Sequence, residues 1–220
     1  MNIKDLFSLK ALINAKNKRE NKRLNEEKRK LHEKELQILS ERLGVDFGGY
    51  IPDTESLGTN SAYCNGYEAS YPMPEIFRML DIKQGDRLLD IGSGKGYAMY
   101  LFSQFPFSKI HGVELSEELF KISKANLEKI FPDDDRFQVF CGDALELDCL
   151  DDYNYIFMYN PFPREIIPTF VDRLKKSLIN NPRKLVVVYQ NPQRGALFEE
   201  SGAFKTLMLK DGTAVFESID

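Results

Sequence analysis

The sequence predicts an α/β fold in which helices cover both faces of a doubly wound, mostly parallel sheet. From Pro74 onward, short apolar segments alternate with amphipathic ones, which is the pattern of successive β-α-β units. Residues 185–188 are continuously apolar, as expected of a strand that is buried on both faces of a sheet. Near the C-terminus, Asp211-Gly212 separates two further strand-like segments, which predicts an antiparallel hairpin.

A long N-terminal helix is expected to precede this fold. Residues 3 to about 43 contain no glycine or proline, and Leu24, Leu31 and Ile38 recur at intervals of seven. Residues 1–43 carry 12 basic and 7 acidic side chains, whereas the rest of the chain carries 18 and 27. Residues 1–43 therefore form a basic helical arm. It could be a solvated helix that packs only its ends, or it could contact an acidic partner, an anionic membrane surface or a second subunit.

The rest of the chain divides into a loop segment and a regular domain. Residues 44–73 form the loop segment, because glycine, proline and asparagine interrupt any periodic pattern there. Residues 74–220 form the domain. Its expected strands are 87–91, 109–114, 137–141, 153–159, 184–189, 204–210 and 213–219, and its expected helices are 74–82, 95–104, 116–131, 167–180 and 193–200.

Composition narrows the class of protein. No apolar run approaches the roughly 20 residues of a membrane-spanning helix, and charges interrupt the N-terminal segment that a signal peptide would need. Three cysteines without C-x-x-C spacing and two distant histidines predict neither a disulfide framework nor a metal site. The body of the domain is acidic, which disfavours a broad nucleic-acid surface on it. We therefore expect a cytoplasmic protein that binds no metal.

A glycine-rich turn follows the first expected strand and indicates a ligand site. Gly92, Gly94 and Gly96 allow the backbone to turn sharply and to approach a ligand closely. A dinucleotide-binding loop would need its third glycine at position 97, where this chain has tyrosine. Asp90, just before the turn, would repel a pyrophosphate and attract a cationic group. The pattern therefore points away from a dinucleotide, and an ordinary strand-to-helix turn is the weaker alternative.

Two acidic residues follow the next two expected strands. Glu114 ends the second one, where a carboxylate can accept both hydroxyls of a ribose, in NAD or in another adenosine ligand. It could instead be a solvated acid beside the helix-capping residue Ser116. Asp143 follows the third strand, where it could accept a hydrogen bond from an adenine amino group or simply form a turn. Both positions favour a nucleoside ligand.

Taken in order, Asp90–Gly96, Glu114, Asp143 and Asn160-Pro161-Phe162 resemble the motifs of the class I S-adenosylmethionine-dependent methyltransferases, over about residues 63–218. The resemblance implies a seven-stranded, Rossmann-like sheet with its last strand antiparallel, and S-adenosylmethionine as the cofactor. It also implies that Glu114 binds the ribose, Asp143 the adenine, and Asp90 with the glycine loop the methionine end. The cofactor-binding residues implied in this way are Tyr67, Asp90, Gly92, Ser93, Gly94, Gly96, Glu114, Leu115, Asp143, Ala144 and Asn160.

The segment after the fourth expected strand is the candidate acceptor site. Asn160-Pro161-Phe162 is similar to the (Asp/Asn)-Pro-Pro-aromatic motif of amino-group methyltransferases, although Phe162 replaces the second proline and Pro163 follows it. In that family the amide oxygen and a backbone carbonyl hold the target nitrogen, and an aromatic ring packs on the substrate. The likeness implies Asn160, Pro161 and Phe162 as catalytic residues. A plain strand-ending turn is the alternative.

A further likeness concerns residues 67–72. This segment resembles the tyrosine-containing segment that precedes the glycine loop in seven-strand protein-lysine methyltransferases, where Tyr67 or Ser70 would touch the cofactor. An ordinary aromatic loop is the alternative. Aromatic side chains around an acceptor lysine would disfavour its ammonium form and contact the sulfonium. The side chains that could do so are Tyr63, Tyr67, Tyr159 and Phe162.

These observations together predict a methyltransferase that acts on an amino nitrogen of a protein. An oxygen acceptor would usually need a general base or a metal, and neither His32 in the arm nor His111 on the second strand lies on the acceptor loops. A small-molecule or RNA acceptor stays open, and the basic arm could serve RNA. From other classes, an NAD-dependent oxidoreductase and a non-catalytic cofactor-binding module stay open as well.

Overall fold

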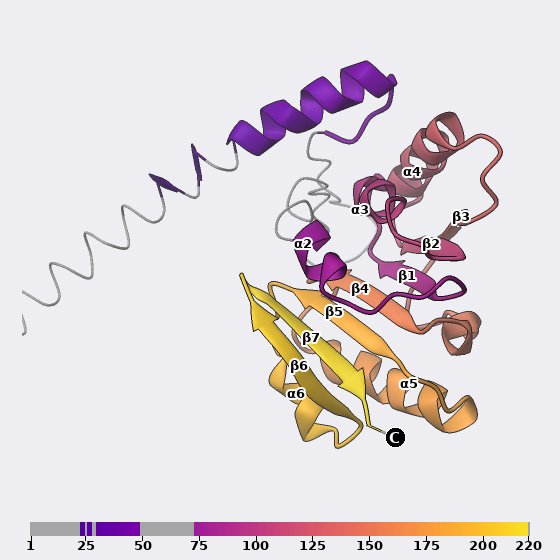
Figure 1. Ribbon diagram of the computed structural model, residues 1–220, viewed down its shortest axis with the longest axis vertical. Coiled ribbons are helices and arrows are strands. Elements are labelled where there is room, and N and C mark those ends of the chain that lie inside the picture. Colours follow the sequence, from indigo (N-terminus) through magenta and orange to yellow (C-terminus); the bar gives the residue numbers. More distant parts are fainter. Residues whose placement is uncertain (1–22, 25, 28–29, 49–72, 220) are drawn as a thin grey trace, which may run out of the picture.

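The computed structural model describes residues 23–24, 26–27, 30–48 and 73–219, and it contains one seven-stranded sheet with helices on both faces (Figure 1). The strand order is β3-β2-β1-β4-β5-β7-β6. The strands are β1 (Arg87–Ile91), β2 (Lys109–Glu114), β3 (Phe137–Cys141), β4 (Tyr155–Tyr159), β5 (Val186–Gln190), β6 (Phe204–Lys210) and β7 (Thr213–Ser218). The helices are α2 (Met73–Arg78), α3 (Tyr97–Phe102), α4 (Glu117–Ile130), the 3₁₀ helix η1 (Asp148–Asp152), α5 (Ile167–Asn180) and α6 (Ala196–Glu200).

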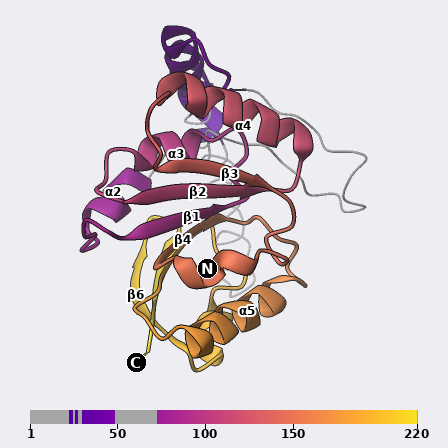
Figure 2. The same cartoon turned by 90° about the vertical axis from the view of Figure 1, so that its right-hand side faces the viewer.

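The directions of the strands confirm the predicted fold class. Strands β1 to β5 run parallel to one another, and Figure 2 shows β3, β2, β1 and β4 beside one another in that order. Strand β7 is antiparallel to β5, and β6 is antiparallel to β7. The hairpin turn Asp211-Gly212 has positive φ angles of 47° and 74°, as a two-residue turn between twisted strands requires.

Strand side chains alternate between two hydrophobic layers. In β1, Leu88 packs with the helices α2, α3 and α4, whereas Leu89 packs with η1, α5 and α6. Because both layers are apolar, the central strands are buried on both faces, as their sequences predict. Asp90 alternates onto the α3 side of the sheet, at the carboxyl edge where the glycine loop begins.

The bounds of several elements differ from those expected. Helix α2 ends at Arg78 rather than 82, and α6 begins at Ala196 rather than 193. Helix α3 begins at Tyr97 rather than 95, because Gly96 has a left-handed backbone and still belongs to the loop. The 3₁₀ helix η1 was not expected at all. The strands at 87–91, 109–114, 137–141 and 204–210 and the helix at 167–180 have the expected bounds.

The N-terminal helix packs on the outside of α3 and α4. Residues 30–43 are helical, and Leu36 and Phe47 are buried against Tyr97, with Tyr100 and Ile130 packed around them. The described part of this helix therefore contacts the body through its C-terminal end. Figure 1 draws this helix in indigo beyond α3 and α4. Residues 1–22 lie outside the described residues, and no helix among the described residues is long and apolar enough to cross a membrane.

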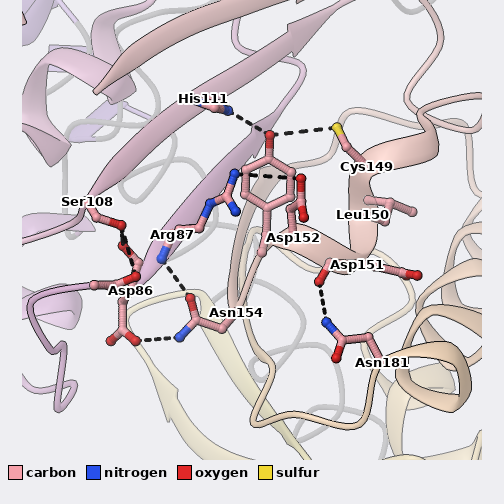
Figure 3. A network of polar contacts seen from close by, with 12 residues as sticks. Asp86, Arg87, Ser108, His111, Cys149, Leu150, Asp151, Asp152, Asn154 and Asn181 are labelled. Atoms are coloured by element: carbon pink, nitrogen blue, oxygen red, sulfur yellow. Dashed lines mark hydrogen bonds and ion pairs between the residues drawn. The ribbon is translucent and has the colours of Figure 1, made fainter. Parts of the chain in front are cut away.

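A polar network joins η1 to the amino-terminal edge of the sheet (Figure 3). The Tyr153 hydroxyl lies 2.7 Å from His111 Nδ1 and 3.8 Å from Cys149 Sγ. Arg87 lies over the Tyr153 ring and pairs with Asp152 at 3.6 Å. Since Arg87 begins β1 and Tyr153 precedes β4, the network lies at the edge opposite the glycine loop. His111, in the middle of β2, therefore contributes to this structural network through its contact with Tyr153.

The position of His111 predicts a loss of stability in acid. Burial, with help from Arg87 and Lys109, lowers the pKa of His111 to about 4. The unfolded chain, with a pKa near 6.5, binds the proton first, so the free energy of unfolding falls as the pH drops from about 6.5 to about 4, by up to roughly 3 kcal/mol. His111→Gln should lose less stability over this range than the wild type, as measured by urea unfolding at several pH values.

Tyr153→Phe is the matched control for this measurement. It removes the hydrogen bond to His111 but keeps the buried imidazole, so it should retain the wild-type pH dependence. If His111→Gln loses as much stability in acid as the wild type does, groups other than His111 cause the loss.

Candidate active site

The glycine loop is built from residues with left-handed backbones. Gly92, Gly94 and Gly96 follow β1 with φ angles of 75°, 54° and 84°. A Cβ on Gly92 would lie 3.0 Å from Pro161 Cβ, and one on Gly96 would lie 2.6 Å from Ser123 Oγ. Larger side chains are therefore excluded by backbone angle and by space. The contact between Gly92 and Pro161 also places the glycine loop directly beside the candidate acceptor loop.

Glu114 is held at the end of β2 by two backbone N–H groups. Its Oε2 accepts a hydrogen bond from Gly94 N at 2.8 Å, and its Oε1 accepts one from Ser116 N at 2.9 Å. Ser116 also caps α4 by accepting from Leu119 N. The carboxylate is therefore buried and oriented by the glycine loop, which excludes a solvated acid. A carboxylate has about four acceptor positions, so further hydroxyl donors are compatible with these two bonds.

Asp90 is a buried carboxyl group with one oxygen that has no donor among the described residues. It is 2 % exposed, and its Oδ2 accepts no hydrogen bond from the described part of the chain. Burial, and then the charge of nearby Glu114, raise the pKa of Asp90 well above its usual value. A buried carboxyl group without a partner is costly, and a ligand that brings an ammonium group or another donor would satisfy it. The site therefore suits the amino-acid end of S-adenosylmethionine.

Ser93 is a second buried polar side chain of the glycine loop. Its Oγ is buried and has no hydrogen-bond partner among the described residues. Ser93 lies over Gly112 of β2, where a Cβ would come within 2.6 Å of the Ser93 Cβ and of Met99 Sδ. The small residue in β2 therefore makes room for the loop. Together, Asp90 and Ser93 provide two buried polar groups without partners among the described residues, which suits a zwitterionic ligand.

Three further residues expected to bind the cofactor, Leu115, Asp143 and Ala144, follow the ends of β2 and β3. Gly142 N donates to Glu114 O at 2.9 Å, which holds these two strand ends together. Asp143 Oδ1 accepts a hydrogen bond from Leu145 N at 2.8 Å. This side chain therefore stabilises the turn after β3, which was the alternative role expected for it. Ala144 is buried in the core, whereas Leu115 is 43 % exposed. The structure thus brings Asp90, Glu114 and Asp143 to the carboxyl ends of three adjacent strands.

Asn160 begins the acceptor loop with a strained backbone. Its φ angle is 41°, a left-handed conformation that is uncommon outside glycine. Its Oδ1 accepts a hydrogen bond from the Tyr189 hydroxyl at 3.0 Å. Pro161 contacts Gly92, and the Phe162 ring packs on Phe170 of α5 with centroids 4.9 Å apart. Phe162 thus anchors the loop to the core, and the substrate-facing role expected for its ring stays a prediction.

Some expected residues are not placed by the structure. Tyr63, Tyr67 and Ser70 lie outside the described residues. Tyr159 is half-buried and packs with the α2 and α3 layer. Among the described residues, no group of three or more potential metal ligands lies together.

An ion pair between buried Lys95 and exposed Asp46 links the glycine loop to the segment after the N-terminal helix. Lys95 is 4 % exposed, and its Nζ lies 2.8 Å from both carboxylate oxygens of Asp46. Asn126 of α4 completes the contact: its Oδ1 accepts from Asp46 N at 2.9 Å, and its Nδ2 donates to Lys95 O at 3.0 Å. We call these three residues the loop clamp. The sequence reasoning missed it, although a polar Asn126 on the apolar face of its helix was an available signal.

The strand order, the left-handed glycine loop and the carboxyl groups that end β1, β2 and β3 define a class I S-adenosylmethionine-dependent methyltransferase. The model of one family, protein-L-isoaspartate(D-aspartate) O-methyltransferase, matches residues 48–176, and the chain belongs to this family. It is therefore a methyltransferase whose cofactor is S-adenosylmethionine. This finding excludes the oxidoreductase and the non-catalytic binding module.

Solved structures show the same fold. A SAM-dependent methyltransferase from Aquifex aeolicus is 17% identical, with 67% of this chain and 90% of that chain covered and a TM-score of 0.53. A candidate RNA methyltransferase from Pyrococcus horikoshii is 17% identical, with 71% and 87% covered and a TM-score of 0.52. A candidate caffeoyl-CoA O-methyltransferase from Staphylococcus aureus is 16% identical, with 67% and 80% covered and a TM-score of 0.50.

Proposed function

We propose that this methyltransferase acts on an amino nitrogen of a protein, with Asn160 and Pro161 at the acceptor site. The observation that supports the proposal is the position of Asn160 at the carboxyl end of β4. Its backbone is left-handed, its side-chain amide is held by Tyr189, and the next residue touches the glycine loop at Gly92. A polar amide held at this place can orient an acceptor beside the cofactor.

The residues that would hold the cofactor follow from the polar groups of the site. Asp90, with Ser93 and the glycine loop, would bind the amino-acid end, and Glu114 would bind the ribose. Asp143 would contact the adenine, and Leu115, Ala144 and Tyr67 would add further cofactor contacts. When bound, S-adenosylmethionine supplies an electrophilic methyl group on a positively charged sulfonium.

The acceptor residues would contribute mainly positioning. Methyl transfer is an in-line displacement, so orientation of the nucleophile supplies much of the rate enhancement. Asn160 Oδ1 would accept a hydrogen bond from the acceptor N–H and thereby direct the nitrogen lone pair. A lysine amine must first lose a proton from a group with a pKa of about 10.4, and apolar surroundings lower that pKa. Tyr159 and Phe162, both half-buried, are close in sequence to Asn160 and suit this role.

A second candidate acceptor is a carboxyl oxygen of a protein, which the family match favours because the family is named for O-methylation. A carboxylate is nucleophilic without losing a proton and therefore needs no general base. This matters because neither histidine of the chain lies on the acceptor loops: His32 is on the N-terminal helix and His111 is within strand β2. In this case Asn160 Nδ2 would donate to the acceptor oxygen.

One experiment separates the two candidates. Methyl-labelled S-adenosylmethionine is incubated with cell extract and either the wild type or Asn160→Ala, and the label is measured in protein, nucleic-acid and small-molecule fractions. The protein fraction is then treated with mild alkali, which releases methanol from carboxyl esters but leaves N-methyl groups. Alkali-stable protein label that Asn160→Ala loses supports the first proposal, and volatile label supports the second. Label confined to another fraction overturns both.

The basic arm is proposed to contact the acceptor. Deletion of residues 1–29 removes most of the basic part of the arm and keeps the helix of residues 30–43, with its packing at Leu36. This deletion should leave the Kd for S-adenosylmethionine unchanged and slow protein labelling, with a difference that shrinks as salt rises. Labelling rates measured at low and high ionic strength provide the test. Equal rates for both chains at every salt concentration would contradict the proposal.

The place of action is a separate proposal. Cys141 and Cys149 are free thiols in the described part of the chain, and the three cysteines of the sequence show no pairing pattern. Because free thiols persist in reducing compartments, we place the reaction in the cytoplasm.

A further inference from the structure

Tyr189 is a fully buried tyrosine next to the end of β5. Its backbone is in register with Met158 of β4 and with Ala214 of β7. Its ring belongs to the core and makes an edge contact with Phe198 of α6, with centroids 6.1 Å apart. Because strands and ring packing hold it from several sides, its hydroxyl has a fixed place at the carboxyl edge of the sheet.

The Tyr189 hydroxyl connects the two loops that leave β4 and β5. It donates to Asn160 Oδ1 at 3.0 Å, and it accepts from Gln193 N at 3.4 Å. A phenol carries a single proton, so a hydroxyl that accepts an N–H on one side can give that proton to an oxygen on the other. These bonds assign the orientation of the Asn160 amide, with Oδ1 rather than Nδ2 facing Tyr189.

Both loops reverse direction in the same way at this edge. Asn160 after β4 and Asn191 after β5 have left-handed backbones, with φ angles of 41° and 52°. Burial raises the pKa of Tyr189, so its hydroxyl keeps its proton and remains a donor at neutral pH. Tyr189 thus supplies a neutral and permanent hydrogen bond between two tight turns.

We propose that Tyr189 is a positioning residue for methyl transfer, which keeps the Asn160 amide from turning over and holds together the two loops that leave β4 and β5. The proposal rests on the proposed role of Asn160. An unrestrained asparagine amide has two orientations that exchange its oxygen and nitrogen, and only one of them presents the atom that a given acceptor needs. The carbonyl oxygen has two lone pairs, so the bond from Tyr189 leaves one for the N–H of an acceptor amine.

The test is Tyr189→Phe, with Tyr153→Phe as the matched control. Both changes remove a buried, hydrogen-bonded hydroxyl and keep the ring, so both chains should fold with a similar small loss of stability. With labelled S-adenosylmethionine and cell extract, Tyr189→Phe should lower the maximal labelling rate about tenfold and leave the apparent KM for S-adenosylmethionine unchanged. Tyr153→Phe should label at the wild-type rate.

The Asn160 variants distinguish failure of this inference from failure of the proposed function. In the Asn160→Ala background, Tyr189→Phe should cause no further loss, because the residue acts through Asn160. If Asn160→Ala labels at the wild-type rate, the proposed function fails and this inference falls with it. If Asn160→Ala loses activity while Tyr189→Phe matches Tyr153→Phe, only the positioning role is overturned. A rise in the KM for S-adenosylmethionine would also overturn it, by indicating a disturbed cofactor site.

Discussion

Asn160→Ala is expected to slow methyl transfer at least about 100-fold, because loss of the group that orients the nucleophile misplaces the acceptor. The Kd for S-adenosylmethionine should change little, since Asp90, Ser93 and Glu114 remain in place. Radiometric labelling gives the rate, and calorimetric titration with S-adenosylmethionine gives the affinity. A wild-type rate would remove Asn160 from the reaction, and a parallel loss of affinity would assign it to the cofactor instead.

The left-handed backbone of Asn160 requires a control for strain. Alanine tolerates a φ angle of 41° poorly, whereas glycine adopts it freely. Asn160→Gly therefore removes the side chain without the strain, and it should lose as much activity as Asn160→Ala. Asn191 has the same backbone conformation on the neighbouring loop but is exposed. Asn191→Ala should show the cost of strain in thermal unfolding while labelling continues.

Asp90→Asn is expected to change stability and cofactor affinity in opposite directions. Because the pKa of Asp90 is raised, the folded protein retains the carboxyl proton to higher pH than the unfolded chain does. The stability that this group contributes is therefore complete below its usual pKa of 3.8. It is lost as the pH rises through the pKa of the folded state. At neutral pH the asparagine avoids this loss, and we expect the free energy of unfolding to rise by about 1–3 kcal/mol. Because asparagine cannot take up the negative charge that a bound ammonium group would favour on Asp90, S-adenosylmethionine should bind roughly 10- to 100-fold more weakly.

Thermal unfolding at several pH values and calorimetric titration measure the two effects. The stability gain of Asp90→Asn should shrink as the pH falls and disappear below the usual aspartate pKa of 3.8, where the wild-type carboxyl group is protonated in both states. Asp143→Asn is the matched control, because Asp143 is only partly buried and already accepts a hydrogen bond from Leu145 N. It should weaken binding without a gain in stability. Unchanged affinity in Asp90→Asn would remove Asp90 from the cofactor site.

The parts of the structure that depend on local sequence could be predicted. The strand from Arg87 to Ile91 and the turn at Asp211-Gly212 follow from apolar runs and turn chemistry, which act over a few residues. The carboxyl groups of Asp90, Glu114 and Asp143 could be brought together by reasoning alone, because the ends of parallel strands share one edge. The lengths of the short helices were less accurate, since their ends depend on packing and on loop geometry.

The parts that depend on distant residues could not be predicted. Lys95 meets Asp46 from 49 residues away, and Asn126 meets it from 80 residues away. Tyr189 reaches Asn160 only because β5 pairs with β4 in one particular register. From sequence alone, a tyrosine in a buried strand is assigned to the core, and no neighbouring residue indicates where its hydroxyl points. Such contacts are properties of the assembled sheet.

The loop clamp joins the N-terminal helix and the glycine loop, so that the order of each depends on the other. Lys95 belongs to the glycine loop, and its two acceptor oxygens on Asp46 belong to the segment that leaves the helix. If docking of this segment stabilises the ordered loop, then ordering of the loop stabilises the docked segment by the same free energy, because linkage between two equilibria is reciprocal. A ligand that binds the ordered loop therefore strengthens docking of the helix, and displacement of the helix weakens binding of that ligand.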